Sequence, residues 1–165
     1  MKYIILLSYY LLIRALTIDA VNAQTTISFR CDTSIKNPQT VAKSKGREII
    51  LITWESNSFA KSGFTPERRC NEVSERLQAY SNSGSLRYIT TGKDKKTKQN
   101  IICSARSKDG VCRSDGLILT LEPKDNPKKV LDTLFSSAFK VKGGSPLIRG
   151  ERVVYDFKYL FEESN

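Results

Sequence analysis

A chain of 165 residues is long enough to bury one hydrophobic core and is typical of a single domain. Because it contains no histidine, it cannot form the serine–histidine or cysteine–histidine pairs of common hydrolases, nor the acid–base pair of the basic ribonucleases. Its net charge of +10 either favours an anionic partner, such as an acidic protein, a membrane surface or an acidic polymer, or serves solubility alone.

Residues 1–23 have the features of a cleavable export signal. Lys2 supplies a positive charge, residues 3–13 form a mostly apolar run, and Val21 and Ala23 suit the −3 and −1 positions of a signal-peptidase site. A membrane anchor is the less favoured alternative, because so short a helix spans about half of a bilayer core of about 30 Å. We therefore expect export to the periplasm, the thylakoid lumen or the outside of the cell, which makes nucleic acid an unexpected partner.

The four cysteines, Cys31, Cys70, Cys103 and Cys112, all follow the predicted signal. An even number of cysteines in an exported chain indicates disulfides. Of the three possible pairings we favour Cys31 with Cys70, which joins a predicted strand to a predicted helix, and Cys103 with Cys112, which flank a polar turn. A zinc site would need all four scattered thiolates, so we expect no metal and no cofactor.

The first part of the predicted domain reads as strands. Alternating apolar residues over 27–31 predict a first strand, and a second resumes at residues 40–42. A basic turn at residues 43–47 precedes the run of apolar and β-branched residues at 48–54. We expect this run to be a central strand that is covered on both faces.

Two helices are predicted by the same start signal, an N-cap residue followed by proline, at Thr65 and at Asn126. The first helix, which ends near Gly84, has an apolar stripe of Cys70, Val73, Leu77 and Tyr80. The stripe of the second helix consists of Val130, Leu131, Leu134, Phe135 and Ala138.

The remaining strands are predicted at residues 86–91 and 100–105, which form a hairpin, at 117–121, and at 153–157, which we expect to be an edge strand. Short hairpin connections predict the α+β class, with one antiparallel sheet of about five to six strands and two helices packed on one face. Residues 24–165 should form a single domain that is a monomer, with a partly ordered extension from about residue 140.

Basic side chains that could bind an anionic partner gather in two loops and at one helix start. They are Lys43, Lys45, Arg47, Lys93, Lys95, Lys96, Lys98, Arg68 and Arg69. If both loops point to the same end of the sheet they form one basic end; otherwise the lysines cap hairpins and protect sheet edges. Arg68 and Arg69 lie where the helix dipole disfavours cations, so they either pair with Asp32 or Glu72 or bind an anionic partner.

Three aromatic residues lie near the start of the first predicted helix. Trp54 ends a predicted buried strand and is expected in the core. Phe64 precedes the N-cap, and we expect it to pack toward Arg69 or Cys70 as a hydrophobic staple. Phe59 either folds onto the core or serves in recognition.

The carboxylates do not predict a catalytic centre. Glu72 and Glu75 are one helical turn apart, but the arginines around them should lower their pKa values. The remaining candidates share no spacing and are Asp109, Asp115, Glu122 and Asp125. We therefore predict no catalytic residues, and keep a carboxylate-dependent hydrolase of acidic or glycan substrates and a structural envelope protein as alternatives to a binding domain.

Several segments in this order form a recognisable set: Phe29-Arg30-Cys31-Asp32, Ile52-Thr53-Trp54, Gly63-Phe64-Thr65-Pro66-Glu67-Arg68-Arg69-Cys70-Asn71-Glu72-Val73, Tyr88-Ile89-Thr90-Thr91-Gly92, Ile102-Cys103 and Leu117-Ile118-Leu119-Thr120-Leu121. Over roughly residues 27–134 the chain resembles the circadian-oscillating polypeptide family of cyanobacteria. The resemblance implies a cyanobacterial host, export and peripheral association with a membrane. It implies no activity and no catalytic residues. The sequence thus predicts an exported, non-enzymatic domain that binds a protein, a membrane surface or an acidic polymer.

Overall fold

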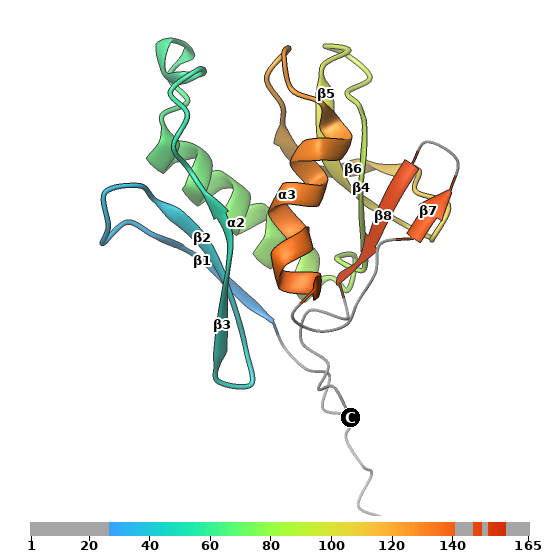
Figure 1. The fold of residues 1–165 in the computed structure, drawn as a ribbon, viewed down its shortest axis with the longest axis horizontal. Coiled ribbons are helices and arrows are strands. Elements are labelled where there is room, and N and C mark those ends of the chain that lie inside the picture. The colour runs from blue at the N-terminus through green and yellow to red at the C-terminus, as the bar shows by residue number, and fades with distance from the viewer. Residues whose placement is uncertain (1–26, 141–146, 150–151, 158–165) are drawn as a thin grey trace, which may run out of the picture.

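The computed structural model describes residues 27–140, 147–149 and 152–157, so the predicted export signal lies outside the described residues (Figure 1). The elements follow the order β1 (Ser28–Asp32), β2 (Gln39–Ser44), β3 (Arg47–Thr53), η1 (Ala60–Ser62), α2 (Pro66–Asn82), β4 (Tyr88–Lys93), β5 (Asn100–Ala105), β6 (Cys112–Thr120), α3 (Pro127–Lys140), β7 (Leu147–Arg149) and β8 (Arg152–Asp156). The predicted α+β class is confirmed.

The strands form two antiparallel sheets, so the prediction of one sheet with five to six strands is wrong. The first sheet has the order β1-β2-β3 and the second has the order β6-β5-β4-β8-β7. Helix α2 carries the chain from the first sheet to the second, and β4 pairs with β5 and β8 rather than with β3 (Figure 1). Sequence periodicity predicts each hairpin, but it carries no signal for whether successive hairpins share a sheet.

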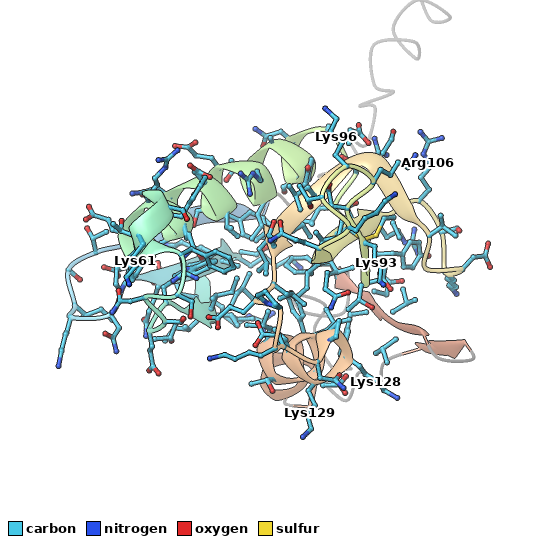
Figure 2. All side chains as sticks on the ribbon, turned by 90° about the horizontal axis from the view of Figure 1, so that it is seen from above. Lys61, Lys93, Lys96, Arg106, Lys128 and Lys129 are labelled. Atoms are coloured by element: carbon cyan, nitrogen blue, oxygen red, sulfur yellow. A yellow bond between two sulfur atoms is a disulfide. The ribbon has the colours of Figure 1, made fainter. Side chains whose placement is uncertain are left out.

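The two helices connect the sheets from opposite sides instead of packing on one face. Helix α2 contacts β1 and β2 of the first sheet and β6 of the second. Helix α3 contacts β3 of the first sheet and β4, β5 and β8 of the second. Seen from above, the green α2 and the orange α3 lie on opposite sides of the molecule (Figure 2). Their apolar stripes therefore face one another across a core that both sheets share.

A single main core unites all these layers, and it includes Ile52, Leu77, Ile102, Leu131 and Tyr155 from five different elements. Disulfides join β1 to α2 and β5 to β6. The predicted pairings are both confirmed, because Cys31 is bonded to Cys70 and Cys103 to Cys112.

Strand β3 is an edge strand, so the prediction of a central strand covered on both faces is wrong. Its side chain Ile50 is 56% exposed, whereas Leu51 and Ile52 are both buried. The pairing shifts between Thr40 and Val41, which pair with Ile52 and Ile50 and leave Leu51 as an extra residue. This β-bulge turns two successive side chains inward, and it explains a continuous apolar run without burial of both faces.

Strand β8 is not at an edge, contrary to the prediction. It lies between β4 and β7, and residues 153–157 are all buried. The segment assigned from sequence to a partly ordered extension therefore supplies an inner strand of the second sheet.

Both predicted helix starts are confirmed by their caps. The hydroxyl of Thr65 accepts a hydrogen bond from the backbone N–H of Arg68 at 3.2 Å. The side chain of Asn126 accepts one from the N–H of Lys129 at 3.0 Å. Among the described helices, none is both long enough and apolar enough to cross a membrane.

Candidate functional site

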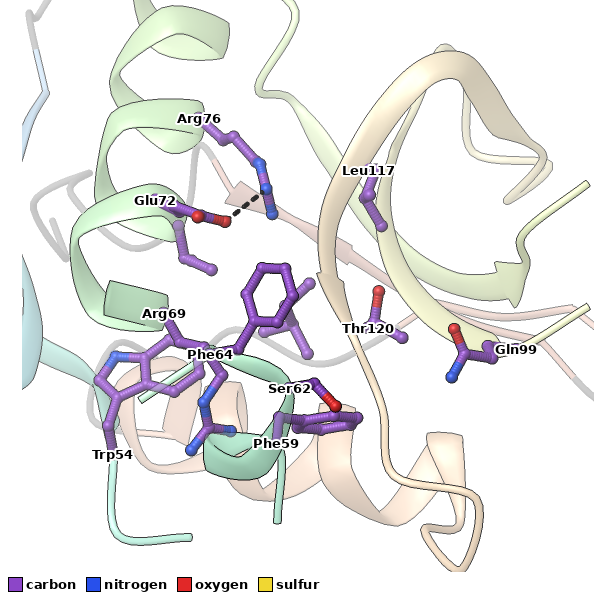
Figure 3. A pocket seen from close by; sticks show the side chains of 12 residues that line it. Trp54, Phe59, Ser62, Phe64, Arg69, Glu72, Arg76, Gln99, Leu117 and Thr120 are labelled. Carbon is purple, nitrogen blue, oxygen red and sulfur yellow. Dashed lines mark hydrogen bonds and ion pairs between the residues drawn. The ribbon is translucent and has the colours of Figure 1, made fainter. Parts of the chain in front are cut away.

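A cavity of about 410 Å³ opens between the start of α2, the loop that carries η1, the β4–β5 turn and strand β6 (Figure 3). Its wall combines aromatic, aliphatic, amide and charged side chains. The lining residues are Trp54, Phe59, Ser62, Phe64, Arg69, Glu72, Val73, Arg76, Gln99, Leu117, Leu119 and Thr120.

The indole ring of Trp54 is held by a buried polar group at the back of the cavity. Its Nε1–H donates a hydrogen bond of 3.0 Å to Thr40 Oγ1, which also lies 3.2 Å from Ser74 Oγ. All three residues are buried, and they come from β2, α2 and the end of β3. The predicted core position of Trp54 is confirmed, and the bond to Thr40 fixes how the ring faces the cavity.

Arg69 lies between two aromatic rings. Its guanidinium carbon is 5.1 Å from the ring centre of Trp54 and 5.6 Å from that of Phe59, a geometry that favours cation–π attraction. Arg69 Nη2 donates to the backbone oxygen of Ser56, and its buried Nε has no hydrogen-bond partner among the described residues. Burial lowers the pKa of Arg69, and the charge of Glu122 opposes this shift. Arg69 therefore contributes a rigid wall, which also lines a second cavity of about 240 Å³.

A row of three charged side chains follows α2, and two of them, Glu72 and Arg76, line the cavity. Arg68 Nε contacts Glu72 Oε1 at 2.8 Å, and Arg76 Nη2 contacts Glu72 Oε2 at 3.0 Å. Arg76 also donates from Nη1 to the backbone oxygen of Ile118 at 3.0 Å. Of the alternatives that the sequence left open, pairing with Glu72 is confirmed for Arg68, whereas Arg69 donates to the Ser56 carbonyl instead. Because two arginines share one carboxylate, the row carries excess positive charge.

Phe64 contacts the guanidinium group of Arg68, whose carbon lies 4.4 Å from the centre of the ring. Phe64 and Arg69 line the same cavity, and the staple between Phe64 and Arg69 or Cys70 stays a prediction. The ring lies near the middle of the cavity in Figure 3 and is 38% exposed.

The lysines of the β4–β5 turn border this cavity. Lys93 and Lys98 line a neighbouring cavity of about 270 Å³, which shares Gln99 with the large one. Asp94 Oδ1 orders the turn by accepting hydrogen bonds from the backbone N–H groups of Lys96 and Thr97, and these bonds lower the pKa of Asp94. The side chains of Lys93, Lys95, Lys96 and Lys98 are all exposed.

The second basic turn is remote from the first. Lys45 lies in the turn between β2 and β3 of the other sheet, with Lys43 near the end of β2 and Arg47 at the start of β3, and this turn lies at the opposite end of the molecule (Figure 1). Lys43 Nζ is 3.4 Å from the carboxylate of Glu48. The two turns therefore do not form the single basic end that the sequence left open.

The described carboxylates whose pKa is shifted all have it lowered. They are Asp32, Glu48, Asp94, Asp115 and Glu122. Hydrogen bonds from Ser56 and Ser58 hold the pKa of Glu122 at about 2. A general acid needs a raised pKa, so none of these five groups is suited to protonate a leaving group at neutral pH. Within the described ranges, no group of three or more histidine, cysteine or acidic residues could hold a metal ion.

Sequence reasoning did not single out several residues of the cavity lining, among them Arg76, Gln99 and Thr120. Helix α2, the β4–β5 turn and β6, which carry these three, meet only through the pairing of the second sheet and its contact with α2. The sole local signal was the position of Arg76 one turn beyond Glu72.

No curated protein and no solved structure matches the chain significantly. Residues 28–161 match the family described as circadian oscillating protein COP23. This match spans every described strand and both α-helices, from Ser28 to Asp156. The chain therefore belongs to the circadian oscillating protein COP23 family.

Proposed function

We propose that the protein is an exported, non-enzymatic module that binds an acidic protein partner in the cell envelope. The cavity at the start of α2 carries this proposal, because aromatic rings, guanidinium groups and an amide line it and lysines border it. Aromatic and arginine side chains in a desolvated pocket are the typical anchors of protein interfaces.

The charge of the cavity favours an anionic ligand. Glu72 is the one carboxylate in the lining, and it is shared by Arg68 and Arg76. Arg69 adds a further cation, and the exposed lysines 93 and 98 continue the positive surface beyond Gln99. Such a surface attracts acidic partners and speeds their association at low salt.

The arrangement of the charges favours a protein over a membrane surface. A flat membrane would be attracted best by basic groups on one face, whereas the two basic turns lie at opposite ends (Figure 1). Under this proposal, the protein partner mediates any peripheral association with a membrane.

Export is part of the proposal, with residues 1–23 as the cleaved signal and the periplasm, thylakoid lumen or cell exterior of a cyanobacterium as the compartment. Two disulfides that include every cysteine of the chain support it, since disulfides persist mainly in oxidising compartments.

The test is co-purification of residues 24–165 with a cyanobacterial envelope fraction, washed with increasing salt. The variant K93Q/K96Q/K98Q removes charge beside the cavity, and K43Q/K45Q/R47Q removes the same charge at the opposite end. Both should change the thermal midpoint of the wild type little, because the five lysines are exposed and Arg47 is only half-buried.

We expect one acidic protein to elute with salt, to be lost with the first variant and to be retained by the second. If no protein is retained, or if both variants lose it equally, a localised binding site is refuted and the charge serves solubility.

A further inference from the structure

The floor of the cavity is suited to one large apolar side chain. Phe59, Phe64, Val73, Leu117 and Leu119 contribute apolar surface, and the volume of about 410 Å³ lies in the lower part of the range for ligand sites. An extended polymer segment would not fit inside, whereas an aromatic or large aliphatic side chain would.

The exposure of Phe64 distinguishes it from other surface apolar residues. The described large hydrophobic side chains that are exposed are Ile35, Ile50, Phe64 and Val111. Of these, Phe64 alone lines the cavity, where its ring is supported on one side by Arg68. An exposed ring in a concave site is available to cover a ligand, whereas scattered exposed residues need no explanation.

Arg76 supplies a cation beside this apolar floor. Its guanidinium points into the cavity in Figure 3, and its side chain is 37% exposed. Glu72 and the Ile118 carbonyl each take one of its N–H groups, and a guanidinium has five. Arg76 can therefore donate to an incoming carboxylate while the two existing bonds hold it in place.

Arg69 has a different role, since its guanidinium lies between Trp54 and Phe59 and its Nε is buried. Arg69 shapes the cavity wall, whereas Arg76 is the group that would bind the carboxylate of a ligand.

We infer that the cavity binds a peptide in which one large apolar residue lies next to acidic residues. This rests on the proposed function and names the class of partner. The apolar side chain covers Phe64, one neighbouring carboxylate binds Arg76, and further carboxylates lie near Lys93 and Lys98.

Titration with three short blocked peptides tests this inference. One contains only acidic residues around a central phenylalanine, one has serine at its centre, and one keeps the phenylalanine but replaces the acidic residues by their amides. Trp54 is the only tryptophan in the chain and lines the cavity, so its fluorescence reports binding. We expect the first peptide to bind about tenfold tighter than either of the others, because burial of a phenylalanine ring and charge pairing both contribute.

Two variants localise the effect. Phe64→Ala should reduce the affinity for the phenylalanine peptide to that for the serine peptide and leave the latter unchanged. Val111→Ala, which truncates an exposed apolar residue outside the cavity lining, should alter neither affinity. Circular dichroism confirms that both variants are folded.

The outcomes separate this inference from the proposed function. Equal affinities for the phenylalanine and serine peptides, unchanged by Phe64→Ala, would overturn the apolar anchor and leave an acidic partner in place. If none of the acidic peptides binds at low salt, the proposed function fails as well.

Discussion

At the scale of single residues, one buried hydroxyl group supports the back of the cavity. Thr40 Oγ1 accepts the indole N–H of Trp54 and lies within hydrogen-bond distance of Ser74 Oγ. Thr40→Val should lower the free energy of unfolding by about 1–3 kcal/mol, because it leaves a buried donor without a partner. Urea unfolding measures this loss, and Thr40→Ser, which keeps the hydroxyl group, is the control. Equal stability of the valine and serine variants would contradict this role.

Gly92 leaves room for the second disulfide. A side-chain Cβ at this position would overlap Cys112 Sγ. Gly92→Ala should therefore lower the thermal midpoint in the wild type but much less in a C103A/C112A background, where the sulfur atoms are missing. The double-mutant cycle isolates this contact. If Gly92→Ala lowers the thermal midpoint equally in both backgrounds, the loss arises from the backbone of β4 and not from the contact with the disulfide.

Glu122 ties two loops together through its ionised carboxylate. Ser56 Oγ donates to Glu122 Oε1 at 2.5 Å, and hydrogen bonds from Ser56 and Ser58 lower the pKa of Glu122 from 4.5 to about 2. Because the folded protein favours the ionised form, this stabilisation is complete above pH 4.5 and is lost as the pH falls toward 2.

Glu122→Gln should therefore lower the thermal midpoint at pH 7, and its difference from the wild type should shrink between pH 4.5 and 2. Thermal melts over this range test the expectation. Glu75→Gln, which removes the same charge from an exposed position on α2, is the control. A difference that stays constant with pH would show that the carboxylate acts through packing alone.

Local signals at the residue scale were read correctly from the sequence, whereas the long-range contacts of the cavity were not; among contacts between distant residues, the sequence predicted the Cys31–Cys70 disulfide. The N-cap of Thr65 and the pairing of Arg68 with Glu72 depend on neighbours within four residues. Arg69 stacks between Trp54 and Phe59, and Trp54 meets Thr40 only across two strands. Contacts of this kind depend on the tertiary fold, which a periodic pattern does not encode.

At the scale of elements, the two disulfides close loops of very different length. Cys31 and Cys70 are 39 residues apart, and Cys103 and Cys112 are 9 apart. Chain entropy predicts losses of about 4 and about 2.7 kcal/mol when each pair is replaced by alanine. Urea unfolding of C31A/C70A and C103A/C112A should therefore rank the first variant as the less stable. The reverse order would show that packing around β5 and β6 outweighs loop entropy.

Strands and helices were predicted better than their assembly. The β4–β5 hairpin, both helices and the disulfide pairs agree with the sequence analysis. The division into two sheets was missed because α2 separates β3 from β4. The apolar pattern of a helix does not predict which sheet the strand after it will join. The bulge at Leu51 was missed because an apolar run reads the same whether one face or both are covered.

At the scale of the whole molecule, the net charge of +10 is divided rather than gathered on one face. The turn with Lys43, Lys45 and Arg47 and the turn with Lys93 and Lys98 lie at opposite ends (Figure 1). The second turn alone borders the cavity, through Gln99. The central claim is thus that one end of the molecule recognises an acidic partner while the other contributes charge only.

Amide chemical-shift mapping of the ¹⁵N-labelled domain, titrated with the acidic phenylalanine peptide, tests this claim most directly. We expect shifts of the Trp54 indole N–H and of the amides of residues 62–64 and 97–99, with residues 43–47 unchanged. Shifts of equal size at both basic turns, or none at the cavity, would show that the charge attracts anions without a site and would contradict the account.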